Sequence, residues 1–353
     1  ETHYRPGIMP SAIYRRYPEV IADAPRRVDP GRPLPVFIIV KDAHRFPVIL
    51  EQAVIHIAYS GGVERIARFP YALKIDSPLW WDSINIIPEY RGNVKVDVYL
   101  QVSRGKRKRM IRADNYPQTS HQPFSTTFAE EPYPGAADWY HGDIHCHSSY
   151  TADKIEFGAP IEVLTFAAYC MGLHWIGVTD HSYDLDDCEN TFSTPDPLLI
   201  RWRLLRKKSE LLASAITVIP GEEVTCRTQQ GKNCHLLALN SDKFIAGSGD
   251  SGEKGLDCHT EKSVGEAVSE CVEWGGMACA AHPLESVPAA ERLLLNRGPW
   301  TPADLETPGV TAIQFYNGAR DDGFRNGKTH WIKMLLGGKR IFAFGGSDSH
   351  GDM

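Results

Sequence analysis

Long apolar runs and an excess of basic residues are both missing from this sequence, and each absence excludes a class of partner. No stretch approaches the roughly 18 to 20 consecutive apolar residues that a membrane-spanning helix needs, so we expect no membrane insertion. The 353 residues carry a formal net charge of −6, whereas non-specific binding to nucleic acid requires a basic face. The composition, 42% hydrophobic and 23% charged, is that of a globular protein, and the length is sufficient for two domains.

The eight cysteines include no Cys-x-x-Cys pair. Several lie inside apolar segments, such as Cys170 in FAAYC and Cys279 in GMACAAH, where a free thiol packs like a small hydrophobic side chain. We interpret them as buried free thiols rather than as a disulfide framework, which favours a reducing, cytoplasmic compartment. No signal-peptide pattern is visible, although a chain that begins at Glu1 is compatible with the removal of a leader.

Residues 1–135 show the two-residue period of β-strands. The segment NVKVDVYLQV (93–102) alternates apolar and polar residues, as a half-buried antiparallel strand does. Further short apolar runs are separated by Gly, Pro, Asn and Asp, and no long helical pattern interrupts them. We therefore predict an all-β sandwich over residues 1–135. The basic run RGKRKR (104–109) predicts a solvated hairpin tip, with a phosphate-binding patch as the alternative.

The pattern changes after the segment EEPYPGAAD (130–138), which we interpret as a linker. Over residues 136–353, amphipathic helical segments alternate with short apolar runs, and one helix is predicted to start with the capping box Ser263 and Glu266. Strands that alternate with helices predict βα units and a parallel sheet. Six or seven such units fit a closed or nearly closed βα barrel, and we expect this fold over residues 136–353.

Residues that can bind a metal ion stand at the C-terminal ends of these apolar runs. The segment YHGDIHCHSSYTAD (140–153) places His145 and His147 two positions apart, so that both side chains project from the same face of an extended strand. The later runs supply Asp180, His181, Glu222, Glu223, His235, His282, Asp348 and His350. In a βα barrel the C-terminal strand ends share one face, where active sites are built. We therefore expect these side chains to converge.

The types of ligand restrict the metal. Imidazoles with carboxylates suit Zn, Mn or Fe, and Cys146 should point away from the face that His145 and His147 share. Buried acids and imidazoles are costly unless they are paired or metal-bound. The set is too large for one ion, so we expect two or three divalent transition-metal ions with at least one bridging carboxylate. Asp143 either orients a ligand imidazole or stabilises a turn.

In sequence order these motifs resemble the PHP (polymerase and histidinol phosphatase) family. The matching segments are HCHSSYTAD, VTDH, PGEEV followed by CHLLAL, AAHP and GSDSH, spread over residues 136–353. A β domain ahead of such a barrel resembles the CehA/McbA-type metallohydrolase branch. The resemblance implies a distorted (β/α)7 barrel that holds up to three metal ions, and a final barrel helix beyond Met353.

The resemblance also implies which residues hold which ion. The sets are His145, His147, Glu223 and Asp348 for one ion, Glu223, His235 and His282 for a second, and Asp153, His181 and His350 for a third. We assign Glu223 rather than Glu222 as the ligand because Glu223 stands two residues after Gly221, as in the family's Pro-Gly-x-Glu pattern. The third set departs from the family, because Asp153 lies one position later than the corresponding acid of many members.

Two or three clustered ions lower the pKa of a bound water and neutralise negative charge on a transferred group, which suits phosphate-ester hydrolysis. The resemblance points the same way, because PHP relatives are mostly phosphoesterases. We therefore predict an enzyme that hydrolyses a small-molecule, anionic phosphate ester, with Glu223, Asp348 and His235 acting through metal-bound water. The nominated phosphate ligands are Arg227, Lys232 and Arg320. The Gly- and Ser-rich segment 241–257 is either a lid or a disordered excursion.

Three alternatives remain open. The same metal centre would serve a carbamate or carboxyl-ester hydrolase, as the resemblance to the CehA/McbA-type branch implies. A nuclease is a second alternative, which the net charge of −6 disfavours. A non-catalytic binding module stabilised by metal is a third, although structural sites are usually closed and single, whereas this cluster is expected at an open barrel mouth.

Overall fold

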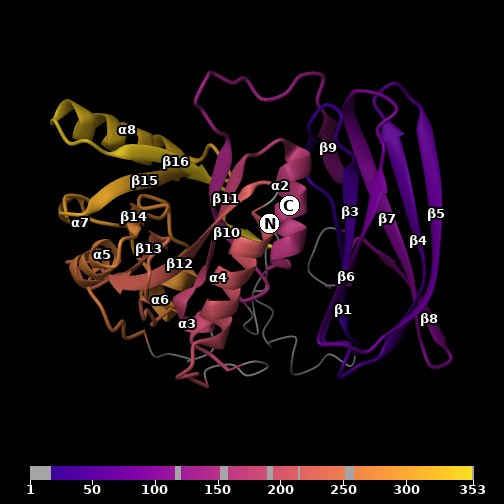
Figure 1. Cartoon of the computed structure of the whole chain (residues 1–353), viewed down its shortest axis with the longest axis horizontal. Coiled ribbons are helices and arrows are strands. Elements are labelled where there is room, and N and C mark those ends of the chain that lie inside the picture. The colour runs from indigo at the N-terminus through magenta and orange to yellow at the C-terminus, as the bar shows by residue number, and fades with distance from the viewer. Residues whose placement is uncertain are drawn as a thin grey trace. The chain divides into compact units, whose positions relative to one another are not determined.

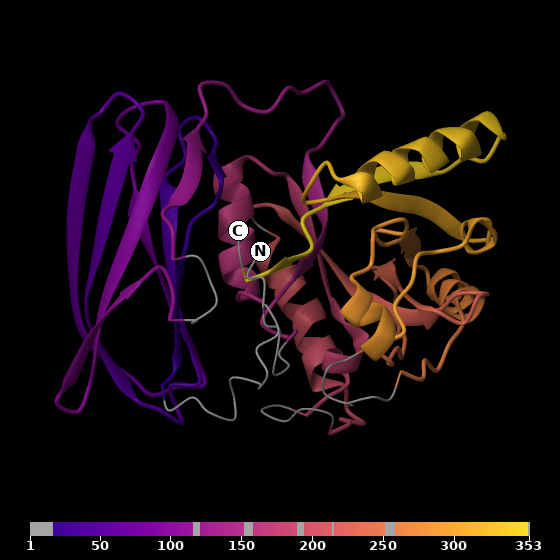
Figure 2. The same cartoon turned by 180° about the vertical axis from the view of Figure 1, so that it is seen from behind.

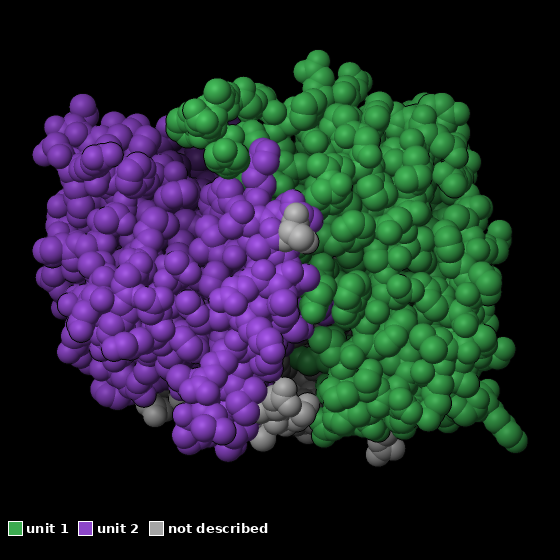
Figure 3. All heavy atoms as spheres, viewed as in Figure 1, with its two compact units in different colours: residues 1–141, 162–173, 352–353 green, residues 142–161, 174–351 purple. Residues whose placement is uncertain are grey.

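The computed structural model describes residues 17–115, 121–151, 158–188, 194–213, 215–250 and 258–351. The chain divides into two compact units (Figure 3): residues 1–141, 162–173 and 352–353 form the first, and residues 142–161 and 174–351 form the second. None of the helices in the described part of the chain combines the length and the apolar character needed to span a bilayer. The eight cysteines are free thiols, six of them buried, as the sequence predicts.

The first unit consists of two β-sheets that share one apolar core (Figure 1). The smaller, antiparallel sheet has the order β1 (Glu19–Asp23), β3 (Leu34–Lys41), β6 (Leu79–Ile86). The larger sheet has the order β2 (Arg27–Val28), β9 (Phe124–Phe128), β7 (Gly92–Arg104), β4 (Val48–Tyr59), β5 (Glu64–Ile75), with β8 (Arg107–Arg112) paired to β7. Ile38 of β3, Ile55 of β4 and Val96 of β7 belong to the same buried cluster, so the two sheets pack face to face. The predicted strand 93–102 lies within β7.

The basic run RGKRKR lies at the turn between β7 and β8. Arg104 and Arg107 are cross-strand partners, and Gly105 between them adopts the left-handed conformation, with φ 60°, that a two-residue hairpin turn favours. Every residue of 104–109 is exposed. The predicted solvated hairpin tip is therefore confirmed.

Helix α2 (Ile161–Met171) packs on the face of the smaller sheet that points away from the sandwich core. Val36 and Ile38 of β3 face that core. Phe37 points the other way, and its ring meets Phe166 of α2 edge to face at 6.2 Å between ring centroids. Both faces of β3 are therefore buried, which explains its nearly continuous apolar sequence. Residues 162–173 thus belong to the first unit although they follow a strand of the second.

The second unit is built on an eight-stranded mixed sheet. The strand order is β16 (Phe342–Gly346), β15 (Val310–Asn317), β14 (Met277–Ala280), β13 (Asn233–Leu239), β12 (Thr217–Arg227), β11 (Trp175–His181), β10 (Gly142–His147), β17 (Ser349–His350). The helices are α3 (Ser182–Leu185), α4 (Ile200–Leu212), α5 (Val264–Glu273), α6 (Ala289–Leu294), α7 (Pro302–Leu305) and α8 (Asp322–Leu336). The prediction of a parallel sheet is wrong for β13, which pairs antiparallel with both neighbours. Residues 228–232 join β12 to β13, whereas parallel pairing needs a crossover of a dozen or more residues.

The sheet curls so far that one segment of chain borders both of its ends. Strand β16 pairs with β15, and β17 pairs with β10, although only Ser347 and Asp348 separate β16 from β17 in the sequence. Segment 342–350 therefore stands between β15 and β10 (Figure 1). Helix α8 lies along β15 in both views (Figure 1, Figure 2). Its Gly327 permits this approach, because an added Cβ would lie 2.3 Å from the Cβ of Phe315.

Both faces of the sheet are buried around its middle strands. Helix α5 begins at the predicted capping box, in which Ser263 Oγ accepts from Glu266 N and Glu266 Oε2 accepts from Ser263 N. The buried side chains of α5 pack with Leu236 of β13, whereas Leu237 packs on the opposite face with Ile144 of β10. With both faces covered by apolar contacts, the strand ends are where polar side chains can gather.

Candidate metal centre

Eight of the nine predicted metal ligands lie together at one edge of the eight-stranded sheet. They are His145 and His147 of β10, His181 of β11, Glu223 of β12, His235 of β13, His282 after β14, Asp348 between β16 and β17, and His350 of β17. Because β13 runs antiparallel, its beginning lies beside the end of β12, with His235 opposite Thr225. The reversed strand thus delivers its histidine to the same edge as the parallel strands do. The ninth residue, Asp153, lies outside the described residues.

The alternation of β10 behaves as the sequence predicts. The Nε2 atoms of His145 and His147 lie 3.1 Å apart, and both residues are fully buried. Cys146 points to the other face, where its Sγ donates to the carbonyl oxygen of Gly177 at 3.3 Å. Burial raises the pKa of this thiol well above its usual value, so it is not a thiolate ligand.

The first group of donors consists of His145, His147, Glu223 and Asp348. Asp348 Oδ1 lies 3.3 Å from His145 Nε2 and 3.2 Å from His147 Nε2. Glu223 Oε2 lies 3.4 Å and 3.3 Å from the same two nitrogens. Nitrogen and oxygen ligands at about 2.0–2.2 Å from a tetrahedral ion are roughly 3.3–3.6 Å from one another. The four residues therefore stand at separations that could hold a metal ion.

Glu223 also belongs to a second group, through its other oxygen. Oε1 lies 2.6 Å from His235 Nδ1 and 3.2 Å from His282 Nε2. Its carboxylate thus has one oxygen toward the His145 and His147 pair and the other toward the His235 and His282 pair. This is the position that a bridging carboxylate would occupy between two ions.

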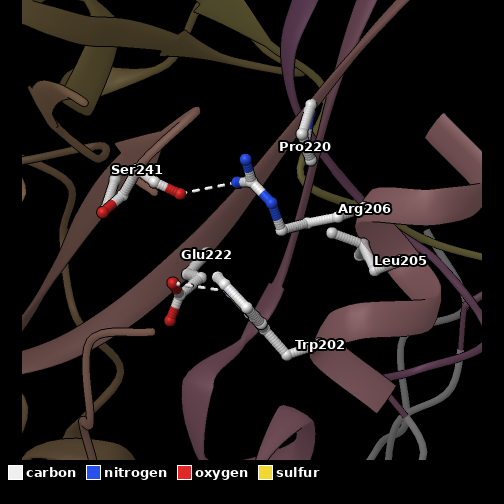
Figure 4. Close-up of a pocket in the computed structure, with 8 residues that line it drawn as sticks. Trp202, Leu205, Arg206, Pro220, Glu222 and Ser241 are labelled. Carbon is white, nitrogen blue, oxygen red and sulfur yellow. Dashed lines mark hydrogen bonds between the residues drawn. The ribbon is translucent and has the colours of Figure 1, made fainter. Parts of the chain in front are cut away.

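The neighbouring carboxylate of Glu222 lies on the other face of β12. Its Oε1 accepts a hydrogen bond from Trp202 Nε1 at 3.1 Å (Figure 4), and its Oε2 accepts one from the backbone N–H of Ile245 at 3.1 Å. Figure 4 also shows Arg206 of α4 beside it, with its guanidinium bound to the carbonyl oxygen of Ser241. Glu222 is therefore held between α4 and the chain after β13, away from the imidazoles.

The third group consists of His147, His181 and His350. The rings of His147 and His350 stack, with their centroids 3.9 Å apart. The centroid of the His147 ring also lies 4.5 Å from that of His181. The resemblance implies Asp153, His181 and His350 for this ion, whereas the described residues group the two histidines with His147. His181 Nδ1 also lies 3.0 Å from Glu223 Oε2, so the three groups adjoin one another.

Some atoms at the middle of the cluster are crowded but make no hydrogen bond. Glu223 Oε2 and His235 Nδ1 are buried and make none, although His235 Nδ1 stands 2.6 Å from Glu223 Oε1. A buried polar atom left without a partner costs about 1–3 kcal/mol. A cation among these lone pairs removes that cost, and the set of imidazoles and carboxylates fits Zn, Mn or Fe. The residues present could therefore hold a transition-metal ion.

The electrostatics of the cluster favour a positive charge at its centre. Burial opposes the ionisation of Glu223 and Asp348, but the adjacent imidazoles outweigh it and hold the pKa of both carboxyls well below their usual range. Burial also opposes protonation of His145, but Asp348 and Glu223 outweigh it and raise the pKa of His145 to about 9. The carboxylates of Glu223 and Asp348 thus attract positive charge to this point, which a bound metal ion would supply in place of protons.

The outward nitrogens of the β10 histidines are held by acceptors. His145 Nδ1 lies 2.9 Å from Gln314 Oε1. His147 Nδ1 lies 3.0 Å from Thr151 Oγ1, whose own hydrogen goes to Asp180 Oδ1 at 2.8 Å. Each Nδ1 therefore donates, and each Nε2 keeps its lone pair for the cluster. Gln314 and Thr151 are functional candidates that sequence reasoning missed.

The two remaining acids of the strand ends serve the backbone. Asp180 accepts hydrogen bonds from the backbone N–H groups of Ser148 and Thr151 and so shapes the loop after β10. Asp143 accepts from the backbone N–H of His145 at 2.9 Å and of Ser347 at 3.1 Å. These two bonds join β10 to the segment that carries Asp348, so Asp143 supports the backbone of the site rather than a ligand imidazole.

Two of the cluster residues have left-handed backbone conformations. The φ angle is 27° at His282 and 54° at Asp348. Such conformations cost a residue with a side chain roughly 1–3 kcal/mol and concentrate at functional sites. Each residue follows the end of a strand, β14 or β16, so the turn that ends the strand also aims the side chain at the cluster.

None of the three nominated phosphate ligands makes a hydrogen bond or an ion pair with the described residues of the cluster. Arg227 and Arg320 are exposed, and Lys232 Nζ donates to Asn296 Oδ1 at 2.8 Å. A basic side chain that does contact the cluster is Arg297, whose Nη2 lies 3.1 Å from His235 Nε2. The sequence around Arg297 carries no motif, so its position follows only from the fold.

The segment predicted as a lid or a disordered excursion is packed over residues 241–250. Gly247 lies against β12, where an added Cβ would meet Val224 Cγ1 at 2.7 Å and the backbone nitrogen of Thr225 at 2.9 Å. Asp250, at the end of this part, is buried. The glycines of the segment were thus a signal of close backbone approach. Residues 251–257 lie outside the described residues.

Comparisons with known proteins add no family. No protein-family model and no curated protein matches the sequence. The X-ray structure of Northeast Structural Genomics Consortium target SoR45 is 9% identical with a TM-score of 0.23, over 35% of this chain and 93% of that one. A beta-glucuronidase from an uncultured Clostridium sp. is 10% identical with a TM-score of 0.16, over 93% of this chain and 43% of that one. Likenesses with TM-scores this low carry no argument about fold or function.

Proposed function

We propose that this protein is a metal-dependent hydrolase of the PHP type. The observation that carries the proposal is the position of Glu223, whose two oxygens face two different pairs of imidazoles, His145 with His147 and His235 with His282. A carboxylate between two ligand groups is the arrangement by which two-metal hydrolases hold their ions. The curled sheet, with segment 342–350 between β15 and β10, supports a distorted (β/α)7 barrel as the fold.

The three groups of donor residues would supply the ligands of two or three divalent transition-metal ions. His145, His147, Glu223 and Asp348 would hold one ion, Glu223, His235 and His282 a second, and His181, His350 and His147 or Asp153 a third. Bound ions would lower the pKa of a coordinated water and offset negative charge on the transferred group. The chain itself fixes the ligand orientations, because Gln314 and Thr151 hold the outward nitrogens of His145 and His147.

Substrate would reach the centre from one side. The side chains of Asp348, His350 and His282 are 23%, 19% and 17% exposed, whereas those of His181 and His235 are 3% exposed. Beside this opening, Asn317 Nδ2 donates to Asp348 Oδ2 at 3.1 Å and to Glu285 Oε2 at 3.3 Å. We propose a small-molecule phosphate ester as the substrate, since several clustered cations neutralise its charge without a basic protein surface.

A carbamate or carboxyl ester is the second candidate substrate. The observation that favours it is the position of the nominated phosphate ligands, because Arg227 and Arg320 are exposed and Lys232 is bound to Asn296. A less charged substrate requires no basic residue beside the metal ions.

The test is an assay of the whole protein with and without metal. Protein purified without chelator and reconstituted with Mn²⁺ or Zn²⁺ is offered phosphomonoesters, phosphodiesters, aryl carbamates and a single-stranded nucleic acid, and its metal content is measured by elemental analysis. We expect two or more equivalents of metal and turnover of a phosphomonoester that a chelator abolishes and added metal restores. Less than one equivalent contradicts the metal centre. Full metal content without turnover of any substrate favours a binding module over a hydrolase.

A further inference from the structure

Asp250 and Arg297 form a charged pair directly behind His235, and neither belongs to the predicted ligand sets. Asp250 Oδ2 lies 2.6 Å from His235 Nε2 and 2.7 Å from Arg297 Nε. Its other oxygen accepts a hydrogen bond from Thr225 Oγ1 at 2.7 Å. The side chain of Asp250 is fully buried, so a carboxylate and its counter-charge have been placed at considerable desolvation cost against one particular imidazole.

The contact with Asp250 determines which nitrogen of His235 faces the metal cluster. An ionised carboxylate can only accept hydrogen bonds, so His235 Nε2 must carry the hydrogen in this 2.6 Å contact. The other nitrogen, Nδ1, stands 2.6 Å from Glu223 Oε1. A bound ion would take the place of a second proton there and receive the Nδ1 lone pair. A neutral imidazole with a free lone pair toward the ion is the form that binds a metal.

Arg297 has the geometry of a counter-charge for Asp250. Its Nε donates to Asp250, and its Nη1 donates to Glu291 Oε2 at 3.1 Å. Its Nη2 lies 3.1 Å from His235 Nε2, but a nitrogen that already carries a hydrogen has no lone pair in the ring plane to accept another. The hydrogen of His235 therefore goes to Asp250, and Arg297 compensates the charge of the carboxylate.

The same kind of contact recurs at two other buried imidazoles of the centre, His145 and His147. Gln314 accepts from His145 Nδ1, and Thr151 accepts from His147 Nδ1. His235 differs from both in two respects: its acceptor is a carboxylate, and the nitrogen left for the cluster is Nδ1. A carboxylate acceptor raises the basicity of the imidazole that it holds, so His235 is the imidazole that this fold makes the stronger ligand.

We propose that Asp250 is the positioning residue of the metal site formed by Glu223, His235 and His282. It holds His235 with the hydrogen on Nε2, directs Nδ1 at the ion, and adds negative charge behind the ring. The proposal rests on the proposed metal centre. Asp250 itself touches neither the ion nor the substrate, so its removal changes how tightly this one ion is held.

Three variants of the whole protein separate this role from a merely structural one. Asp250→Ala removes both the acceptor and the charge. Asp250→Asn keeps an oxygen that can face His235 and Arg297 but removes the charge, so its effect should lie between those of wild type and Asp250→Ala. Glu291→Gln is the matched control, because it also removes a carboxylate from Arg297 without touching His235.

The first readout is metal binding, measured by titration calorimetry with Mn²⁺ or Zn²⁺ and by elemental analysis. Wild type should bind two or more ions. In Asp250→Ala the affinity of one site should fall by about 10–100-fold, the usual cost of losing such a partner, while the remaining sites keep theirs. Glu291→Gln should bind like wild type. A folded Asp250→Ala protein with wild-type affinity at every site overturns the inference, whereas a wild-type protein that binds no metal overturns the proposed function as well.

The second readout does not depend on a variant that folds. Long-range proton–nitrogen NMR spectra of Zn²⁺-reconstituted wild-type protein labelled in histidine report which nitrogen of each imidazole carries the hydrogen. The signal of His235 should show a protonated Nε2 and an Nδ1 without hydrogen, and in Asp250→Asn the population of that form should decrease. A hydrogen on Nδ1 of His235 in wild type overturns the inference, even where Asp250→Ala fails to fold.

Discussion

Glu222 and Glu223 are consecutive residues of β12 whose carboxylates point to opposite faces of the sheet. Glu223 lies among the imidazoles of His145, His147, His181, His235 and His282, whereas Glu222 accepts hydrogen bonds from Trp202 and Ile245. Both are almost fully buried, but their pKa values move in opposite directions. Burial raises the pKa of Glu222 to about 8, while the imidazoles around Glu223 overcome burial and hold its pKa well below the usual range.

The first prediction compares the two isosteric variants of this pair. Glu223→Gln keeps the size of the side chain, but its amide offers only one useful donor oxygen and no charge to hold two ions together. We expect the loss of at least one equivalent of metal and a fall in turnover of more than about 100-fold, beyond the usual cost of losing a residue that only supports a ligand. Glu222→Gln should retain metal and most of its activity. A dead Glu222→Gln enzyme beside an active Glu223→Gln enzyme would contradict the proposed role of Glu223.

The second prediction concerns the dependence of stability on pH. The pKa of Glu222 is about 8 in the folded protein, against an ordinary value of 4.5, so the folded state binds this proton more tightly than the unfolded state does. The stability that it contributes is fully present below pH 4.5 and is lost as the pH rises through 8. Between these values, the free energy of unfolding of wild type should fall relative to Glu222→Gln by up to about 1.4 kcal/mol per pH unit.

Urea denaturation of metal-free wild type and Glu222→Gln at several pH values between 5 and 9 measures this difference. Chelated samples are needed because metal binding has its own pH dependence through the imidazoles. Two curves that run parallel across this range would show that Glu222 is not protonated in the folded protein.

The third prediction is that metal stabilises the fold. The candidate ligands come from seven strands or strand ends. Metal ions would bind this folded arrangement, which the unfolded chain lacks. At a free concentration 1,000 times the dissociation constant, one site adds about 4.1 kcal/mol, which for a unit of this size raises Tm on the order of 10 °C. Calorimetric scans with chelator and with Mn²⁺ or Zn²⁺ measure the shift. Equal Tm values at saturating metal would mean that the cluster binds no ion, and Glu223→Gln should show a smaller shift than wild type.

The fourth prediction tests the packing of segment 241–250. A Cβ at Gly247 would lie 2.7 Å from Val224 Cγ1 and 2.9 Å from the backbone of Thr225. Gly247→Ala should therefore cost about 1–3 kcal/mol of stability, and it should weaken metal binding because the displaced segment carries Asp250. Urea denaturation and metal titration measure the two effects.

Gly265→Ala is the matched control for that substitution. Gly265 lies in α5, and the nearest heavy atom to an added Cβ is Ser263 Oγ at 4.0 Å. Alanine is the better helix former, so this variant should gain up to about 1 kcal/mol. A Gly247→Ala protein as stable as Gly265→Ala would show that segment 241–250 is a loose lid.

The cluster of imidazoles and carboxylates was predictable because short-range geometry determines most of it. His145 and His147 share a face by the period of a strand, and the same alternation separates Glu223 from Glu222. The remaining ligands stand at ends of apolar runs, which a curled sheet brings to one edge. The direction of β13 was not predictable in the same way, because a strand's sequence does not state its orientation. His235 reaches the edge from the beginning of its strand rather than from the end.

Asp250 and Arg297 escaped prediction for a different reason. Each lies in irregular chain, and their contact spans 47 positions, so no local period relates them. Only the packing of segment 241–250 against β12 brings Asp250 to His235. The glycines at positions 247 and 249 indicate that another segment of backbone approaches closely. They do not indicate which segment it is. Residues that support the ligands thus depend on tertiary packing more than the ligands themselves do.

A crystal structure of the metal-reconstituted protein, with anomalous scattering recorded at the metal edge, would test directly whether Glu223 stands between metal ions. We predict at least two anomalous peaks about 3.5–4 Å apart, one on each side of the Glu223 carboxylate, the first beside His145 and His147 and the second beside His235 and His282. Fully occupied metal elsewhere with no peak at Glu223, or a single peak that Glu223 does not contact, would contradict the bridging role of Glu223.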